Sequence, residues 1–511
     1  MVSVRLSMLL AGAPVAVVCA QTPSVEGVWL SQGYGCVFEI SGLTLKAFEV
    51  TATSCVPGFT AERDTTAVPG REATFKTADG DVWFIRGGGA SDHKRLHHDG
   101  SASDVRIDRL PRLPEVCDHP TENTLADNFE VFSRTWAEHY ISFDLRKTDW
   151  GDIVRANRPK ITARTTPAEL FDILAGMIRP FDDAHTFLDA PELKRQLHGL
   201  RSGTDRVVRG GFTEFRSKGM PALLAVTERS YLQAPLHKWC RDQIQYGHLD
   251  RTTGYLRILS FGGYSEVPGF AAGLAALEAA LDSVFSDPAL GRLVIDVRIN
   301  FGGDDPYGLA IASRLAASEY LAYTKEARAD PVDRDRWTPG DPSWVRPSSR
   351  PGFRGPIAEL IGPLTVSAGE TFTQALMGRT PHVTRIGENT QGVFSDVLVR
   401  RLPNGWRFGL PNEVFRTPEG TTFDGMGIPP DIPVPVFADE DVTAGKDPGL
   451  AKALQVLAKE YRLHLRGSSL WHEHAPPGLG WDLLGAVWAL SSPRTAVAHS
   501  SAVEIRWKGD E

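Results

Sequence analysis

The sequence predicts an α/β protein built around a largely parallel, buried sheet. Between residues 253 and 377, apolar strand-like runs alternate three times with helical patterns. Strands joined by helices usually run parallel and are covered on both faces. The 511-residue chain is too long for this unit alone, because domains typically span ~100–200 residues. We therefore expect two to four units.

The composition is that of a globular protein. Apolar residues make up 42% of the chain and charged residues 23%, with a formal net charge of −8. Nucleic acids and anionic membranes reward clustered Lys and Arg. The acidic balance therefore argues against both as main partners, and no later membrane segment is evident.

Residues 1–20 have the pattern of a signal peptide. A single charge, Arg5, precedes an apolar stretch from Met8 to Cys19, and the segment ends in Ala20. The stretch is shorter than the ~20 residues of a membrane span. We expect cleavage after Ala20 and a secreted or periplasmic location, with a lipoprotein signal at Cys19 as the weaker alternative.

Four cysteines follow this segment, and an exported chain permits disulfides between them. They are Cys36, Cys55, Cys117 and Cys240. Cys36–Cys55 is a plausible local bridge and Cys117–Cys240 a plausible long-range one. Three pairings are possible in all, and free buried thiols remain open.

The elements before the sheet fall into three regions. Residues 21–112 alternate apolar and polar residues between Gly-rich turns, which predicts a β-rich accessory domain. After a Pro-containing linker, residues 120–190 read as a helical subdomain. Its first helix places Leu125, Phe129, Phe132 and Trp136 on one face, and its second begins at Thr166. Residues 191–250 are a mixed connecting region.

The core is expected over residues 251–463. Strands are predicted at 253–263, 291–303 and 356–367, and helices near 268–286, 305–317 and 368–378. A hairpin with an Asn404-Gly405 turn and a last helix ending near 463 complete it. The tail, 464–511, has no clear period, and we expect it to be poorly ordered.

Ser367 lies in "PLTVSAGETF", between a predicted strand and a predicted helix. Serine is a favoured N-cap, and Glu370 three residues later completes the pattern of a capping box. The same junction is where nucleophiles and ligands collect in parallel sheets, since helix N-termini expose free N–H groups. Both interpretations of Ser367 stay open on this stretch alone.

Two neighbouring loops could serve such a nucleophile. The N–H group of Ala368 and those of Gly302 and Gly303 in "NFGG" could form an oxyanion hole. A serine also needs a base, either a lysine or a histidine with an orienting acid. His185, in "FDDAHTFLDAP", is the histidine with the most suggestive neighbours.

Four separated motifs together resemble the C-terminal-processing (tail-specific) serine protease family. They are "DDAHTFL", "IDVRINFGG", "TVSAGETFTQAL" and "GENTQG…GIPPDIPV", in family order over residues 125–435. The lysine-dependent branch carries its base at a position that falls on Val393. Valine cannot accept a proton, so the chain is more similar to the branch without the lysine, that of the tricorn core.

The resemblance implies a ClpP/crotonase-like sheet-and-helix core and a serine endopeptidase. It assigns Ser367 as nucleophile, His185 as base and Asp424 as orienting acid, with Asp183 as the alternative acid. It implies a protein or peptide substrate and no metal or cofactor. Asp296, Arg298 and Asn300 match the family but are interpreted as structural.

Two other functions compete with this one. A catalytically inactive relative could bind peptides or hydrophobic ligands on the same fold. An enzyme acting on acyl thioesters should show a basic pocket for coenzyme A, and no Lys/Arg cluster suggests one. We expect no complete PDZ domain between His185 and Tyr255. The oligomeric state is not predicted.

Overall fold

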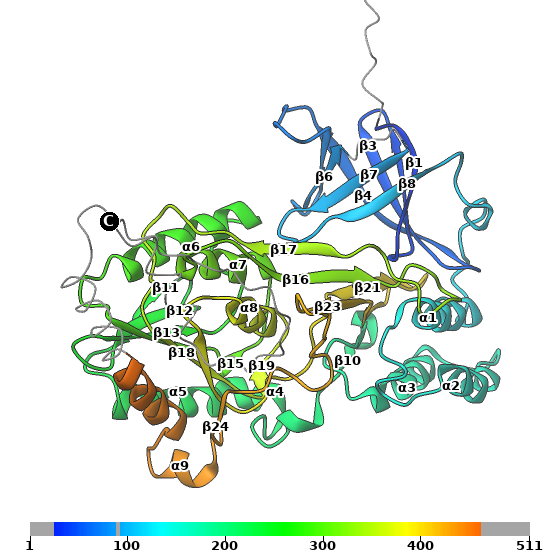
Figure 1. Cartoon of the computed structure of the whole chain (residues 1–511). Coiled ribbons are helices and arrows are strands. Elements are labelled where there is room, and N and C mark those ends of the chain that lie inside the picture. Colours follow the sequence, from blue (N-terminus) through cyan, green and yellow to red (C-terminus); the bar gives the residue numbers. More distant parts are fainter. Residues whose placement is uncertain (1–24, 88–91, 461–511) are drawn as a thin grey trace, which may run out of the picture.

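The computed structural model describes residues 25–87 and 92–460. A β-barrel, a group of helices and a sheet-and-helix body make up the molecule (Figure 1). The predicted signal peptide and the tail from residue 464 lie outside the described residues, so both stay predictions. No helix in the described ranges is long and apolar enough to cross a membrane.

The β-rich N-terminal stretch is a closed eight-stranded antiparallel barrel, in which the last strand pairs back with the first. Its interior is apolar and centres on Trp29 and Phe75, which are fully buried. The strands are β1 (Gly27–Ser31), β2 (Cys36–Ser41), β3 (Thr44–Val50), β4 (Cys55–Asp64), β5 (Ala73–Thr77), β6 (Val82–Gly87), β7 (His93–His98) and β8 (Val105–Leu110).

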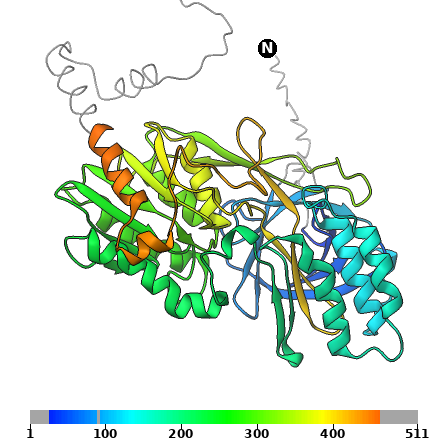
Figure 2. The same ribbon diagram turned by 90° about the horizontal axis from the view of Figure 1, so that it is seen from below.

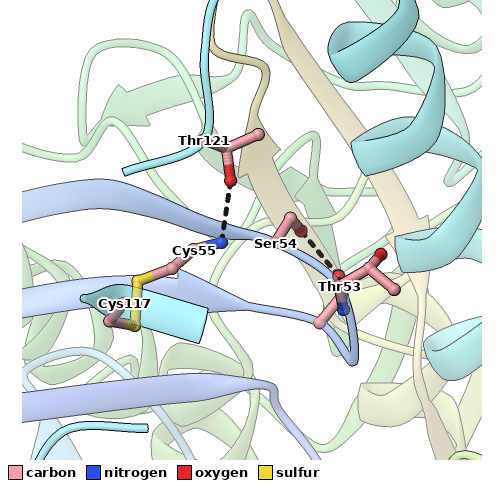
Figure 3. The surroundings of a disulfide bond; sticks show 6 residues. Thr53, Ser54, Cys55, Cys117 and Thr121 are labelled. Atoms are coloured by element: carbon pink, nitrogen blue, oxygen red, sulfur yellow. Dashed lines mark hydrogen bonds between the residues drawn. A yellow bond between two sulfur atoms is a disulfide. The ribbon is translucent and has the colours of Figure 1, made fainter. Parts of the chain in front are cut away.

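The disulfide joins Cys55 to Cys117, so both pairings named from the sequence are wrong. Cys55 opens β4, and Cys117 lies in a short 3₁₀ turn, η1 (Glu115–Cys117), of the linker. Thr121 of the same linker accepts a hydrogen bond from the Cys55 N–H (2.9 Å; Figure 3). The bridge thus ties the barrel to the segment that leads into the helices, and Cys36 and Cys240 are free thiols.

The helical subdomain contains both predicted helices, α1 (Leu125–His139) and α3 (Pro167–Ile178). A short helix that the sequence did not reveal, α2 (Trp150–Asn157), lies between them. Their aromatic faces pack on a four-stranded sheet of order β10-β9-β22-β21. Its strands are β9 (Phe187–Ala190), β10 (Arg195–His198), β21 (Val397–Arg401) and β22 (Arg407–Pro411). The last two form the predicted hairpin.

The central sheet has seven strands in the order β11-β12-β13-β14-β18-β20-β24, and β13 through β24 are parallel. Leu293 and Ile295 face one apolar cluster and Val294 the other, so the sheet is buried on both faces as predicted. The strands are β11 (His237–Trp239), β12 (Ile244–His248), β13 (Thr253–Ile258), β14 (Arg292–Asp296), β18 (Ile357–Ile361), β20 (Val383–Gly387) and β24 (Ile432–Pro433).

Helices cover the two faces of this sheet. One cluster packs against α6 (Phe270–Phe285), α7 (Asp305–Leu315) and α8 (Ala368–Met377). The other packs against the helix at 448–460, the last described segment. Figure 2 shows this last helix on the opposite side of the body from α1, α2 and α3.

Smaller elements complete the body. A three-stranded antiparallel sheet joins β17 (Asp341–Val345), β16 (Tyr320–Ala327) and β23 (Glu413–Arg416), and the sequence did not reveal its β16–β17 hairpin. The mixed connecting region contains α4 (Gly211–Glu214) and α5 (Met220–Ser230), and a short helix, α9 (Asp439–Thr443), precedes the last one.

Candidate active site

Two short strands bring the Ser367 segment beside the Gly302 loop. β15 (Ile299–Asn300) follows β14, β19 (Leu364–Thr365) follows β18, and the two pair in parallel. Gly302 comes two residues after β15, and Ser367 comes two residues after β19. Because the strands are parallel, both residues lie at the same end of the pair, where α7 and α8 begin.

Ser367 has a strained backbone that ordinary N-caps do not share. Its φ is 55° and its ψ is −119°. Thr124 and Thr166, which cap α1 and α3, have extended angles near φ −98°, ψ 161° and φ −88°, ψ 160°. The Glu370 N–H, which a capping serine side chain would bind, donates to the Ser367 backbone carbonyl at 2.7 Å. A non-glycine residue held at positive φ between strand and helix is typical of functional sites.

The N–H groups around Ser367 differ in their availability. A Cβ added at Gly302 would lie 2.7 Å from Ser367 Cβ and 3.2 Å from the Ala368 nitrogen, so this loop touches the nucleophile candidate. The Gly302 N–H donates to Asn300 Oδ1 at 2.9 Å. The N–H groups of Gly303 and Ala368 have no acceptor within the described ranges. Of the three predicted donors, Gly303 and Ala368 therefore have N–H groups available for a substrate oxygen, whereas that of Gly302 is engaged; the oxyanion hole itself stays a prediction.

Glu370 ties the start of α8 to the loop that contains Val393. Its carboxylate accepts hydrogen bonds from the Gly392 and Val393 N–H groups at 2.6 and 2.8 Å, and from the Ser367 N–H at 3.3 Å. Burial is the largest of the effects that raise the pKa of Glu370 to about 7. Since carboxylates rarely bury without partners, Glu370 fixes the position of residues 392 and 393 beside Ser367.

His185 comes just before β9 and reaches the next residues of the same loop. The Ser395 carbonyl and the carboxylates of Asp183 and Asp396 lie close enough to favour its charged form. Asp183 Oδ1 also accepts the His185 backbone N–H at 3.0 Å. The Nδ1 atom is buried without a hydrogen-bond partner in this part of the chain. Burial outweighs the attractions and lowers the pKa of His185.

Asp424 contacts the same loop at Phe394, the residue before Ser395. Its Oδ1 accepts the Phe394 N–H at 3.2 Å. Burial first, and then the charge of Asp183, raise the pKa of Asp424 to about 7. The structure gives no hydrogen bond between Asp424 and His185 in the described residues. Asp183 interacts with both of them.

Residues 392–396 are thus the place where the predicted site residues meet. Glu370 holds residues 392 and 393, Asp424 binds residue 394, and Ser395 and Asp396 lie close enough to His185 to favour its charged form. Ser367, Gly302 and Ala368 are in direct contact with one another, and Glu370 links them to this loop.

Sequence reasoning missed the side chains that hold these parts together. Arg201 donates to the carbonyls of Asp182, Gln391 and Gly425, which joins the histidine motif, the Val393 loop and the Asp424 loop. Tyr140 donates to Asp183 at 2.9 Å. Only the motif "GENTQG" pointed toward this region. Within the described ranges, no three His, Cys, Asp or Glu side chains are grouped as a metal ion would require.

Comparison with known proteins supports the fold and the arrangement of segments. Residues 252–434 match the model of peptidase family S41, and residues 121–179 match that of the tricorn protease C1 domain. The structure of a protein from Parabacteroides merdae assigned as a peptidase is 25% identical. It aligns over 66% of this chain and 97% of its own, with a TM-score of 0.52.

Two curated relatives are carboxyl-terminal-processing enzymes. Carboxyl-terminal-processing peptidase 2, chloroplastic, of Arabidopsis thaliana is 24% identical over 55% of this chain and 50% of its own. The carboxy-terminal-processing protease of Bartonella bacilliformis is 26% identical over 38% of this chain and 42% of its own. The chain thus spans half or less of the length of these relatives. The similarity to peptidase family S41 thus covers the sheet-and-helix body, and the similarity to the tricorn protease C1 domain covers α1 to α3.

Proposed function

We propose that this protein is an exported serine endopeptidase that hydrolyses peptide bonds through an acyl-enzyme on Ser367. We further infer that its body has a ClpP/crotonase-like core without a catalytic lysine. The strained Ser367 backbone is the observation that carries the proposal, because it stands beside two unoccupied N–H donors inside an S41 domain. Export rests on the pattern of residues 1–20.

The base in this mechanism is His185. Burial lowers the pKa of its imidazole, so the ring is neutral at neutral pH and can accept a proton. Val393 occupies the position of the family's lysine. Lys325, which pairs with Asp396 and Glu413, is a poor base because these two carboxylates raise its pKa far above the usual value.

The proposed reaction follows the acyl-transfer template. Ser367 Oγ attacks the peptide carbonyl while His185 takes the hydroxyl proton and then gives it to the leaving amine. The N–H groups of Gly303 and Ala368 bind the oxyanion, and losing one such donor typically costs ~2.7–4 kcal/mol of barrier. Water, deprotonated by His185, then releases the acyl group.

The orienting acid is Asp424 in this proposal, and Asp183 is its alternative. Asp183 accepts the His185 backbone N–H, and its charge acts on Asp424. Catalytic hydrogen bonds often tighten only when substrate binds. The direct contact between Asp424 and His185 is therefore expected in the substrate complex.

A labelling experiment tests the proposal. Wild-type protein should react with a fluorophosphonate probe at Ser367, located by mass spectrometry, and should cleave unfolded casein. Ser367→Ala should lose both, and His185→Ala should slow labelling by at least about a hundredfold. Absence of labelling in folded wild type would leave the non-catalytic, ligand-binding relative as the better account.

A further inference from the structure

A buried ion cluster lies where the barrel meets the peptidase body. The Lys325 side chain on β16 is 6% exposed, and its Nζ is 2.7 Å from Asp396 Oδ2 and 3.3 Å from Glu413 Oε1. Glu413, on β23, is almost completely buried. Lys325 and Glu413 are buried and the Asp396 side chain is 52% exposed, so removing Lys325 or Glu413 would leave an uncompensated buried charge.

A tyrosine of the barrel completes this cluster. Tyr34, in the turn between β1 and β2, donates its hydroxyl to Glu413 Oε1. The other oxygen of Glu413 accepts the Asp396 N–H at 3.2 Å. The turn itself is anchored, because Arg400 donates to the Tyr34 carbonyl and Asn412 donates to the Gly33 carbonyl. The contacts therefore run from the barrel through Glu413 and Lys325 to Asp396.

The far end of this chain of contacts faces His185. His185 comes just before β9 and Asp396 just before β21, and these two strands run in the same direction on either side of β22, so both residues lie at one end of this sheet. There the Asp396 carboxylate attracts the charged form of His185. Ser395 Oγ accepts the Asn412 and Glu413 N–H groups at 3.1 and 3.0 Å. Ser395 and Asp396 are thus held against Glu413, the residue of β23 to which Tyr34 donates.

Other titratable groups surround the same place. Asp183 faces His185 from its own segment, and Asp304 and Asp305 interact with Asp396 from the start of α7. Tyr323, on β16, interacts with Asp305. Lys325 is the cation that lies among these acids. The more closely it pairs with Asp396, the less the negative charge of Asp396 acts on His185.

We propose that the Tyr34 turn of the barrel is a positioning part of the catalytic site. Tyr34, Glu413 and Lys325 hold Asp396 beside His185 and thereby set the orientation and the charge of the imidazole. Tyr34 touches neither substrate nor reacting atoms, so it is a positioning residue. The proposal rests on the proposed function, in which His185 is the base.

The test measures the charge of His185 directly in the full chain. Diethylpyrocarbonate modifies neutral imidazole, so the modification rate of His185 against pH, followed by mass spectrometry, gives its titration midpoint. Asp396→Asn should lower that midpoint by about one pH unit, because a nearby carboxylate favours imidazolium. It should also slow fluorophosphonate labelling of Ser367 about tenfold or more.

Tyr34→Phe should change both quantities in the same direction but less. Burial raises the pKa of Glu413 and the tyrosine hydrogen bond lowers it, so without that bond Glu413 takes up a proton more readily. Lys325 then pairs more strongly with Asp396 and screens it from His185. The matched control is Tyr246→Phe, which loses a tyrosine–carboxylate hydrogen bond of the same kind, to Asp287 at 2.7 Å, on β12. The control should leave the midpoint and the labelling rate unchanged.

The outcomes separate this proposal from the proposed function. If Tyr34→Phe lowers only the unfolding temperature, like Tyr246→Phe, the barrel turn is structural and the proposal is wrong. Should Tyr34→Phe fail to fold, Asp396→Asn decides, since that side chain is 52% exposed and tolerates the change; an unchanged midpoint overturns the proposal. Wild type that labels at no pH refutes the peptidase function, whereas the His185 midpoint still reports on Tyr34 and Asp396.

Discussion

At the scale of single residues, the backbone of Ser367 differs from that of the residues that cap α1 and α3. The sequence pattern around Ser367 fits both roles, because Glu370 follows three residues later in either case. Thr166 shows what a true cap looks like here: its Oγ1 accepts the Glu169 N–H and its own N–H is bound by Glu169. Ser367 makes the second of these bonds, but with its backbone at φ 55° and ψ −119°.

This contrast predicts different stabilities for two alanine variants. Thr166→Ala should lower the free energy of unfolding by about 1 kcal/mol, since it removes a cap hydrogen bond. Ser367→Ala should change it by clearly less. Urea unfolding of both variants beside wild type measures this, and equal losses would support the cap interpretation of Ser367.

A second prediction at this scale concerns Asp424 and pH. A carboxyl group with a raised pKa must lose its proton before it can orient His185. Since burial and Asp183 raise the pKa of Asp424 to about 7, kcat/KM should fall as the pH drops through about 7. Asp183→Asn removes a charge that raises the pKa of Asp424 and that of His185, so the acid limb should move to lower pH.

The measurement is the pH at which kcat/KM falls on the acid side, and not only the value that kcat/KM reaches at its plateau. Asp183 also holds the backbone of His185, so a lower plateau is expected for structural reasons alone. A limb that stays in place when Asp183 is replaced would show that another group controls it.

At the scale of elements, β18 carries an unusual buried acid beneath α8. Glu359 is fully buried, accepts the Thr373 hydroxyl at 2.9 Å and leaves Oε2 without a partner in the described residues. Burial raises its pKa from 4.5 to about 7. The folded state therefore favours the protonated, neutral form of Glu359.

The raised pKa of Glu359 makes the stability of the fold depend on pH. Between pH 4.5 and about 7 the folded state holds a proton that the unfolded state releases, so stability falls as the pH rises through this window. The loss is on the order of 3 kcal/mol. Glu359→Gln cannot titrate, so its stability relative to wild type should improve between pH 5 and pH 8. Unfolding midpoints at the two pH values measure this, and a constant difference would contradict it.

Most elements of the central sheet could be predicted from the sequence, because periodic apolar patterns determine them locally. The β16–β17 hairpin could not, since Lys325 interrupts the apolar positions of β16 and becomes acceptable only when Asp396 and Glu413 surround it. The bridge between Cys55 and Cys117 likewise depends on how the barrel docks, which spacing does not encode.

The candidate site likewise has parts that the sequence predicts and parts that it does not. Ser367, Ala368 and the Gly302 loop follow from adjacent strand ends of a parallel sheet, a rule of topology. The surroundings of His185 do not, because Asp396, Tyr140 and Arg201 come from distant segments and meet it only in the folded chain. Sequence reasoning named the acids Asp424 and Asp183 and had no means to find the cluster around Lys325.

At the scale of the whole molecule, the barrel is joined to the body by several contacts. Arg95 forms an ion pair with Asp341 of β17 at 3.1 Å, and Glu49 accepts the Arg401 N–H at 2.7 Å. The Ala52 N–H donates to Glu138 of α1 at 3.0 Å. The barrel therefore touches both the helices and the antiparallel strands.

The disulfide should make a large contribution to this arrangement. It closes a loop of 62 residues, for which the loss of chain entropy in the unfolded state corresponds to about 4 kcal/mol. Cys55→Ser with Cys117→Ser, or reduction with dithiothreitol, should lower the temperature at which the barrel unfolds. Calorimetry measures this, and Cys36→Ser serves as the control; identical transitions would show that the bridge is dispensable.

The order in which the site's parts occur along the chain has a consequence for biosynthesis. The ribosome makes the barrel first, then His185, the Gly303 donor, Ser367 and finally Asp424. Until the last of these has emerged and folded, the growing polypeptide holds a nucleophile without its full machinery. Under the proposed function, a newly made molecule would thereby be protected from digesting itself or its neighbours before its translation is nearly finished.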